Sequence, residues 1–154
     1  MTDDAAATPP LDLSLFGEDH VRAYRESGGA VGQIWNGVPT LVLQTVGRVS
    51  GLPRATPLIC AADGDDGDRY VVIASQGGAP THPQWYLNLV AEPRVDVQFG
   101  ADRFDAVART AEGDERDRLW TLMTDAWPSF DTYQSRTDRV IPLVVLERME
   151  EDER

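Results

Sequence analysis

The alternation of apolar and polar residues predicts a chain built mostly of short strands. Six runs have the length and composition of strands, at 40–46, 54–62, 70–74, 95–99, 104–108 and 141–146. The segment Asp63-Gly64-Asp65-Asp66-Gly67-Asp68 predicts a hairpin loop between two of them. Neighbouring strands joined by turns favour an antiparallel barrel with helices over its ends (α+β) over a doubly wound parallel sheet.

Other segments show helical periodicity. A first helix is expected over 18–26 and closes at Gly28-Gly29. A second begins near Pro83 and ends before Pro93, and Asp114 is expected to cap a third. The remaining helical positions are the apolar stripe of Leu119, Leu122, Met123 and Ala126, and a short segment within 129–139.

Length and composition predict one domain. The chain has 154 residues, of which 42% are hydrophobic, and this is enough for a single core. We expect the domain over 13–148. Residues 1–12 are expected to be a disordered N-terminal segment, and 149–154 an acidic tail.

Charge and cysteine content limit the function classes. The net charge of −12 argues against nucleic acid, because a phosphate-binding face needs clustered basic residues. The single Cys60 excludes a disulfide framework and favours a buried thiol in the cytoplasm. No run is long enough to span a bilayer, so stable membrane insertion is not expected. Peripheral contact through Leu13 and Phe16 stays open, although acidic neighbours disfavour it.

The glycine-rich turn within 45–57 carries the most specific chemistry. Gly47 and Gly51 let backbone N–H groups converge, and Arg48 and Arg54 add guanidinium groups that suit phosphate or carboxylate oxygens. We therefore expect a local anion site on an acidic protein. The alternative is that both arginines only form salt bridges to nearby carboxylates.

Other candidate sites are weak. His20 and His82 have no third ligand at metal spacing, so no metal site is expected; His82 is expected to help open its helix. Ser75 lacks the frame of a hydrolase nucleophile. The start of the helix near Pro83 is a second position that suits an anion.

Four ordered motifs between about residues 35 and 147 resemble the deazaflavin (coenzyme F420)-dependent nitroreductase family. They are Thr45-Val46-Gly47-Arg48 with Ser50-Gly51, Pro53-Arg54 and Thr56-Pro57; Ala74-Ser75 with Gly77-Gly78; His82-Pro83 with Trp85-Tyr86 and Asn88-Leu89; and Tyr133-Gln134 with Thr137, Arg139 and Ile141-Pro142. The resemblance implies a split β-barrel of the FMN-binding-like superfamily. It also implies hydride transfer from reduced F420 to a quinone, nitroaromatic or similar conjugated acceptor.

The resemblance also implies roles for individual residues. The cofactor-binding positions are Arg48, Ser50, Gly51, Arg54, Pro57, Ala74, Ser75, Gln76, Gly77, Gly78 and Trp85. Tyr133 and Ser75 are the candidates for hydrogen bonding to the acceptor oxygen. The chain departs from the family at Val49, where lysine is common, and at Phe130 and Arg136, where the family often has tyrosines.

Two other classes stay open. One is an FMN-dependent reductase of the same barrel, because FMN also presents a phosphate. The other is a non-catalytic carrier of a deazaflavin, haem-like or lipid ligand. A homodimer is compatible with all of these.

Overall fold

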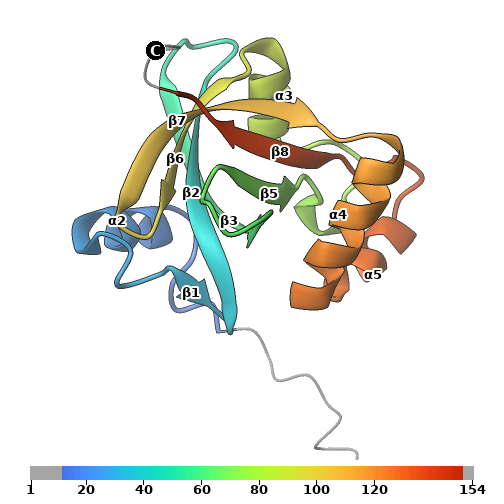
Figure 1. The fold of residues 1–154 in the computed structure, drawn as a ribbon, viewed down its shortest axis with the longest axis horizontal. Helices are drawn as coiled ribbons and strands as arrows, with labels where there is room; N and C mark the ends of the chain where they lie inside the picture. The colour runs from blue at the N-terminus through green and yellow to red at the C-terminus, as the bar shows by residue number, and fades with distance from the viewer. Residues whose placement is uncertain (1–11, 151–154) are drawn as a thin grey trace, which may run out of the picture.

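A curled antiparallel sheet with four α-helices around it forms the described part of the chain, residues 12–150 of the computed structural model (Figure 1). The strands are β1 (Ile34–Trp35), β2 (Val38–Val46), β3 (Pro53–Ile59), β4 (Ala61–Ala62), β5 (Arg69–Ile73), β6 (Arg94–Phe99), β7 (Asp102–Thr110) and β8 (Leu143–Arg148). The helices are α2 (Gly17–Ser27), α3 (Gln84–Ala91), α4 (Gly113–Ala126) and α5 (Ser129–Ser135), with one 3₁₀ turn, η1 (Gln76–Gly78). The disorder predicted for the N-terminal segment and most of the predicted acidic tail concern residues 1–11 and 151–154, outside the described residues.

The sheet order confirms the expected antiparallel strands of a split barrel and adds the two short strands β1 and β4 to the six that were expected. The strands follow the order β1-β2-β6-β7-β8-β5-β4, and β3 pairs with β2. Strand β2 is the centre of this arrangement, because residues 40–46 pair with 53–59 while 42–44 also pair with 96–98. All pairings are antiparallel.

The prediction of a single strand over 54–62 is wrong in one respect. The chain leaves β2 at Ile59 and pairs with β5 from Ala61 onward. Between these positions the N–H of Cys60 donates to the carbonyl of Pro39 (3.0 Å). The strand therefore changes partner at Cys60, which bends the sheet toward closure. Cys60 is buried as expected, and burial raises the pKa of its thiol.

The two hydrophobic cores lie on opposite faces of the sheet. One fills the barrel and includes Leu41, Val97 and Leu146; the other lies beneath α4 and α5 and includes Leu119, Met123 and Ile141. Each core uses alternate residues of β5 and β8, as expected for strands with both faces buried.

The expected cap at Asp114 is wrong. Helix α4 begins at Gly113 after Glu112, and no side chain caps it. Asp114 and Glu115 instead lie in the first turn, where their charge interacts favourably with the helix dipole. At the other predicted helix end, Gly28 closes α2 in the left-handed conformation, as expected.

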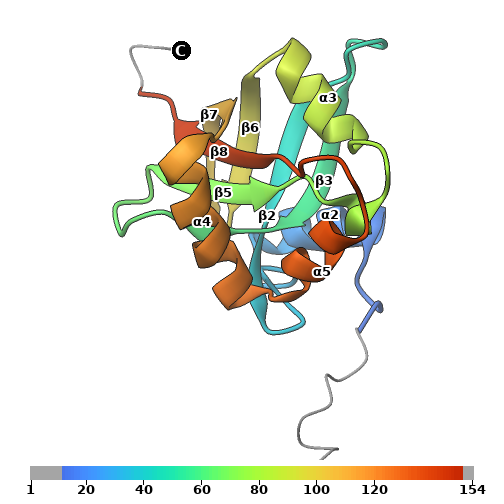
Figure 2. The same ribbon diagram turned by 90° about the vertical axis from the view of Figure 1, so that its right-hand side faces the viewer.

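The helices surround the sheet in a way that positions the candidate site. Figure 2 shows α4 and α5 next to each other at one end and α3 beside the tip of the β2–β3 hairpin. Helix α2 contacts β3, and α5 contacts η1. Within residues 12–150, no helix has the length and apolar character needed to cross a membrane.

Candidate functional site

The glycine-rich turn closes mainly on itself. Gly47 N–H donates to Leu52 O (2.8 Å), and Gly51 N–H donates to Gly47 O (2.8 Å). Leu52 N–H donates to Ser50 Oγ (3.1 Å). A Cβ at Gly47 would lie 2.6 Å from Ser50 Oγ and 3.1 Å from Leu52 O, so a side chain there would force the Ser50 hydroxyl to move. The turn therefore uses the N–H groups of Gly47, Gly51 and Leu52 internally, and these three are not available to an anion.

The positive charge of the turn comes from Arg48, which α3 holds in place. Its Nη1 and backbone N–H both donate to Asn88 Oδ1 (2.9 and 3.2 Å), and its Nη2 donates to Gln84 Oε1 (2.8 Å). Asn88 is only 4% exposed and donates to Thr45 Oγ1 (3.2 Å). Because both partners are neutral amides, they fix the guanidinium without cancelling its charge.

Arg54 lies on β3 across the hairpin from Thr45 and is exposed. Seven ion pairs occur among residues 12–150, and neither Arg48 nor Arg54 takes part in any of them. The alternative that these arginines only pair with carboxylates is thus not what the structure has. Both line a cavity of about 510 Å³, here the arginine cavity, formed by Gly47, Arg48, Val49, Ser50, Arg54, Ala55, Thr56, Gln84, Trp85 and Asn88.

A second cavity of about 570 Å³ adjoins the first. We call it the aromatic cavity; it is lined by Leu13, Phe16, His20, Trp35, Thr40, Thr56, Pro57, Leu58, Ile59, Ile73, Ser75, Gln76, Gly77, Pro83, Trp85, Trp127, Phe130 and Tyr133. Thr56 and Trp85 line both cavities. The exposed Leu13 and Phe16 border this cavity, which is where the apolar N-terminal pattern contacts the barrel.

Aromatic rings form one wall of the aromatic cavity. Trp35 packs on Trp127 with ring centroids 6.1 Å apart, and Phe130 packs on Tyr133 at 6.0 Å. Trp127 Nε1 donates to the hydroxyl of Tyr133 (3.4 Å). Since an indole N–H can only donate, the hydroxyl accepts this bond and keeps its own hydrogen for another partner.

The loop that follows β5 forms another wall in an unusual backbone conformation. Gln76, Gly77 and Gly78 all have positive φ (46°, 64° and 84°). A Cβ at Gly78 would lie 2.5 Å from Tyr133 O, so glycine is needed for α5 to pack here. Gln76 is not a glycine, and a non-glycine residue in this left-handed backbone conformation costs about 1–3 kcal/mol of conformational strain.

Arg139 compensates by holding this loop. Its guanidinium donates to three carbonyl oxygens, Ala79 O (2.8 Å), Ala74 O (3.2 Å) and Ser75 O (2.7 Å). It also donates to His82 Nδ1 (3.0 Å), and burial, followed by the charge of Arg139, lowers the pKa of His82. The expectation that His82 opens its helix is wrong, because α3 begins at Gln84 after Pro83 without a side-chain cap.

Most of the predicted site residues meet at the two cavities. Arg48, Ser50, Arg54 and Trp85 line the arginine cavity, and Pro57, Ser75, Gln76, Gly77, Trp85 and Tyr133 line the aromatic cavity. The other three line neither of the two: Gly51, Ala74 and Gly78. Gly51 shapes the turn, Ala74 is fully buried and accepts from Arg139, and Gly78 packs against α5.

Sequence reasoning missed several residues that the structure brings to the site. These are Gln84 and Asn88 beside Arg48, and His20, Trp35 and Trp127 in the aromatic cavity. Only Gln84 and Asn88 had a usable signal, because residues four apart share a helix face. The others come from segments that tertiary packing alone brings together.

Comparison with known proteins agrees with this geometry. Residues 17–148 match the family model of F420H(2)-dependent quinone reductases. An F420H(2)-dependent quinone reductase from Mycobacterium tuberculosis is 40% identical over 151 residues, with 90% of this chain and 99% of that protein covered.

Solved structures agree as well. One described as an F420-H2 dependent reductase is 41% identical and has a TM-score of 0.64, covering 71% of this chain and 94% of that one. Another, described as a domain-swapped dimer, is 36% identical with a TM-score of 0.67 and covers 84% of this chain and 98% of that one. The expected split-barrel fold is confirmed, and a structure described as an FAD-binding protein, 12% identical with a TM-score of 0.51, has a similar fold.

Proposed function

Since the chain belongs to the F420H(2)-dependent quinone reductase family, we propose that its two adjoining cavities hold reduced F420 and a quinone next to each other. The chain is an F420-dependent oxidoreductase, and its reaction is hydride transfer from F420H2 to a quinone. The observation that carries the proposed arrangement is the shared boundary, since Thr56 and Trp85 line both cavities. A long ligand with an anionic end and a planar end can occupy both.

The residues present fit this cofactor. F420 ends in a phosphodiester followed by glutamates, and the arginine cavity offers two guanidinium groups that form no ion pair with any carboxylate of residues 12–150. We assign Arg48 and Arg54 to these oxygens, with Ser50 beside them. Charge-assisted hydrogen bonds of this kind are about twice as strong as neutral ones.

We assign the planar end of the cofactor to the boundary with the aromatic cavity. Pro57, Ser75, Gln76, Gly77 and Trp85 would surround it there. The three carbonyl bonds from Arg139 keep the 74–79 loop in the shape that this contact needs. When bound, the reduced deazaflavin supplies the hydride, which no amino-acid side chain can donate.

The aromatic cavity suits a planar, conjugated acceptor. Trp35, Trp127 and Phe130 offer flat apolar surface, which also excludes water from the reacting atoms. The free hydroxyl hydrogen of Tyr133, and Ser75, are placed on the same cavity. We propose that both donate to the acceptor oxygen as it gains negative charge, which is the role of a preorganised donor.

The departure at Val49 tunes this site. The side chain is 92% exposed at the rim of the arginine cavity, where the family commonly has lysine. Valine in place of lysine therefore removes a charge from the rim and leaves the hydrogen bonds from Arg48 to Gln84 and Asn88 in place. We expect weaker tail binding than in relatives that keep the lysine.

Titration of the purified protein with F420, followed by tryptophan fluorescence, tests the proposal. We expect quenching that shrinks in Trp85→Phe and persists in Trp120→Phe, because Trp120 lies outside both cavities and bonds to Asp131. Turnover with F420H2 and menadione must accompany binding. Binding without turnover would favour the carrier, and a bound chromophore absorbing near 450 nm instead of about 420 nm would favour FMN.

We also propose a homodimer in the cytoplasm. Support for the dimer comes from the 36% identical structure that is described as a domain-swapped dimer. Support for the location comes from the single buried thiol of Cys60. Light scattering of the purified protein at micromolar concentration, giving the mass of one chain, would overturn the dimer, and fractionation of cells tests the location.

A further inference from the structure

His20 is a buried titratable residue that the reaction described above does not use. It lies on α2 and is only 2% exposed. It nevertheless lines the aromatic cavity, together with Ser75 and Tyr133. An imidazole in the wall of a reaction cavity can move a proton at neutral pH, which a serine or tyrosine hydroxyl does poorly.

The imidazole is fixed through one of its nitrogens. Nε2 lies 2.8 Å from Gly32 O, and because a carbonyl can only accept, Nε2 carries a hydrogen in both charge states. The hydroxyl of Thr40 donates to the same carbonyl. Gly32 has a φ of +100°, and a Cβ there would lie 2.8 Å from Cδ2 of His20. The backbone approaches the ring too closely for any other residue.

The second nitrogen is available to a ligand. Nδ1 of His20 has no hydrogen-bond partner among residues 12–150. It is not sealed in the protein either, since no fully buried side-chain nitrogen or oxygen in this part of the chain lacks a partner. Nδ1 is therefore not fully enclosed, and we take its access to be toward the cavity that His20 lines.

No fixed charge lines this cavity. Its polar side chains are, besides His20, Thr40, Thr56, Ser75, Gln76 and Tyr133, and no aspartate, glutamate or arginine of the described residues is among the lining. Near His20, Glu18 and Asp19 of α2 are exposed to solvent. The ring of Tyr24 lies 6.3 Å away, and its hydroxyl donates instead to Thr40 O. Among the described residues of this lining, His20 is thus the one imidazole, the side-chain type best suited to proton transfer.

We propose that His20, as an imidazolium, donates its Nδ1 proton to the quinone oxygen that becomes anionic during reduction. This assignment rests on the proposed function. The quinone gains a hydride and this proton and becomes the hydroquinone; F420H2 loses the hydride and releases one proton to water. The neutral imidazole then takes a proton back from water, so that atoms and charge balance. Ser75 and Tyr133 keep their role as hydrogen-bond donors to the oxygen.

His20→Gln tests the proposal, because glutamine can still donate to Gly32 O but cannot carry the proton. Turnover of menadione by wild type should fall as pH rises, because the proposed donor must be an imidazolium. The variant should be about 10- to 100-fold slower at about pH 6 and should lose this pH dependence. Its F420 affinity, from tryptophan fluorescence, should stay within about twofold of wild type. A variant with wild-type rate and pH profile would overturn the assignment.

Tyr24→Phe is the matched control. It removes the hydroxyl that joins α2 to Thr40 O and to the N–H of Gly100, but it leaves the imidazole in place. A general loosening of α2 would slow both variants and leave both with the wild-type pH dependence, and that result contradicts the proposal. If His20 donates the proton, only His20→Gln loses the pH dependence.

A measurement without turnover decides the matter even where His20→Gln fails to fold. NMR of the imidazole nitrogens in the wild-type protein should show Nδ1 of His20 shifting on addition of menadione, while His82, whose Nδ1 already accepts from Arg139, stays unchanged. An unmoved Nδ1 overturns the assignment. If wild type binds F420 and still reduces no quinone, the proposed function itself fails, and this result is distinct from either failure of His20.

Discussion

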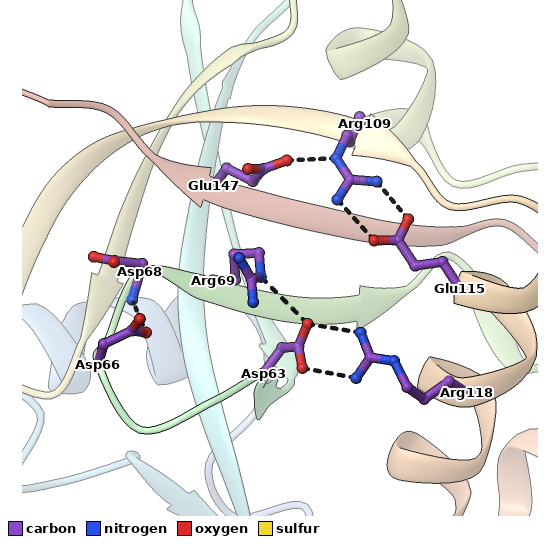
Figure 3. A network of polar contacts seen from close by, with 8 residues as sticks. All are labelled: Asp63, Asp66, Asp68, Arg69, Arg109, Glu115, Arg118 and Glu147. Carbon is purple, nitrogen blue, oxygen red and sulfur yellow. Dashed lines mark hydrogen bonds and ion pairs between the residues drawn. The ribbon is translucent and has the colours of Figure 1, made fainter.

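Two pairs of arginines in this protein differ in what they face. In one region, Arg109 of β7 and Arg118 of α4 are both bound to carboxylates (Figure 3). In the other, Arg48 and Arg54 of the arginine cavity take part in no ion pair of the described residues. The chain has 26 acidic residues against 14 arginines, so carboxylates are abundant. Other described arginines, such as Arg116 and Arg139, also form no ion pair, but Arg48 and Arg54 lie together on one cavity, and for that reason we propose this cavity as the site for an anion.

The paired arginines pin α4 to the sheet at two points. Arg109 donates to Glu147 of β8 and, through two nitrogens, to Glu115 of α4. Arg118 donates to both oxygens of Asp63 (2.9 and 3.1 Å), which also accepts from Arg69 of β5 (3.3 Å). Helix α4 contributes Glu115 and Arg118 to these two contacts, and their partners are Arg109 of β7 and Asp63, which directly follows β4; we call the two contacts the α4 clamp. We expect the clamp to act on stability and the arginine cavity to act on binding.

The double substitution Arg48→Ala with Arg54→Ala should have the largest effect, and this effect should be on cofactor binding. We expect F420 affinity to fall about 100-fold, or ~2.7 kcal/mol, because two charge-assisted contacts are lost. The melting temperature should change little, since neither side chain bonds to a carboxylate. Fluorescence titration and thermal unfolding of the same sample measure both quantities.

A charge-matched control keeps that result specific. Arg22→Ala with Arg94→Ala removes the same charge from two exposed positions outside both cavities. It should leave F420 affinity within about twofold of wild type. An equal loss in both double variants would mean that overall charge, and not the arginine cavity, attracts the cofactor.

Asp63→Asn should lower the stability of the fold and leave cofactor binding unchanged. Asp63 is 8% exposed and accepts from two arginines of different elements. Loss of its charge should lower the free energy of unfolding by about 1–2 kcal/mol, measured with urea, while F420 affinity stays unchanged. Asp66→Asn in the same loop is the control, because among the described residues Asp66 accepts only from the N–H of Asp68, and its loss should cost less (Figure 3). Equal losses in the two variants would mean that the α4 clamp does not stabilise the fold.

Sequence patterns predicted the strands well because most of them obey a simple rule. Strands β5, β6 and β8 carry apolar residues on the faces that touch a core, and their periodicity reports this directly. The break at Cys60 gave no such signal, because the residue stays buried while its strand changes partner. The short β1 does have a signal in the sequence, because Asn36-Gly37 is the dipeptide typical of a tight hairpin.

The site was predictable only where it is local. Arg48 lies in the turn of the β2–β3 hairpin and Arg54 at the start of β3, so their proximity follows from the hairpin itself. The residues that support them come from elsewhere, as Asn88 lies 40 positions from Arg48 along the chain. His20 shows the limit most clearly. Nothing in its surroundings in the sequence indicates that α2 would place it on the same cavity as Tyr133.

Salt concentration should have a smaller effect on F420 binding. Raising NaCl from about 0.1 M to about 1 M shortens the Debye length from about 10 Å to about 3 Å. Exposed arginines that bind an anion should then lose affinity, and we expect F420 binding to weaken about fivefold in wild type. The Arg48→Ala, Arg54→Ala double variant should show almost no salt dependence. A wild-type affinity that does not change with salt would argue against an electrostatic role for the pair.

The smallest effect is the pH dependence of the α4 clamp. Hydrogen bonds from Arg118 are the main cause that lowers the pKa of Asp63 below its ordinary 3.8, and those from Arg109 lower the pKa of Glu115 below 4.5. A carboxyl with a lowered folded-state pKa binds fewer protons in the folded state than in the unfolded one. Its contribution is therefore complete above the unfolded value and is lost as pH falls through the folded value.

We accordingly expect the free energy of unfolding to be steady near neutral pH and to decline from about pH 5 to values below 3.8, the range set by these two carboxyls. Asp63→Asn should show a shallower decline, because one of the two titrating groups is gone, while Arg48→Ala with Arg54→Ala should follow the wild-type curve. Urea midpoints measured across this range test both. A decline of equal slope in wild type and Asp63→Asn would mean that Asp63 is not among the carboxyls that set acid stability. A shallower slope in the Arg48, Arg54 variant would mean that those arginines stabilise the fold after all, and the division between the two pairs would not hold.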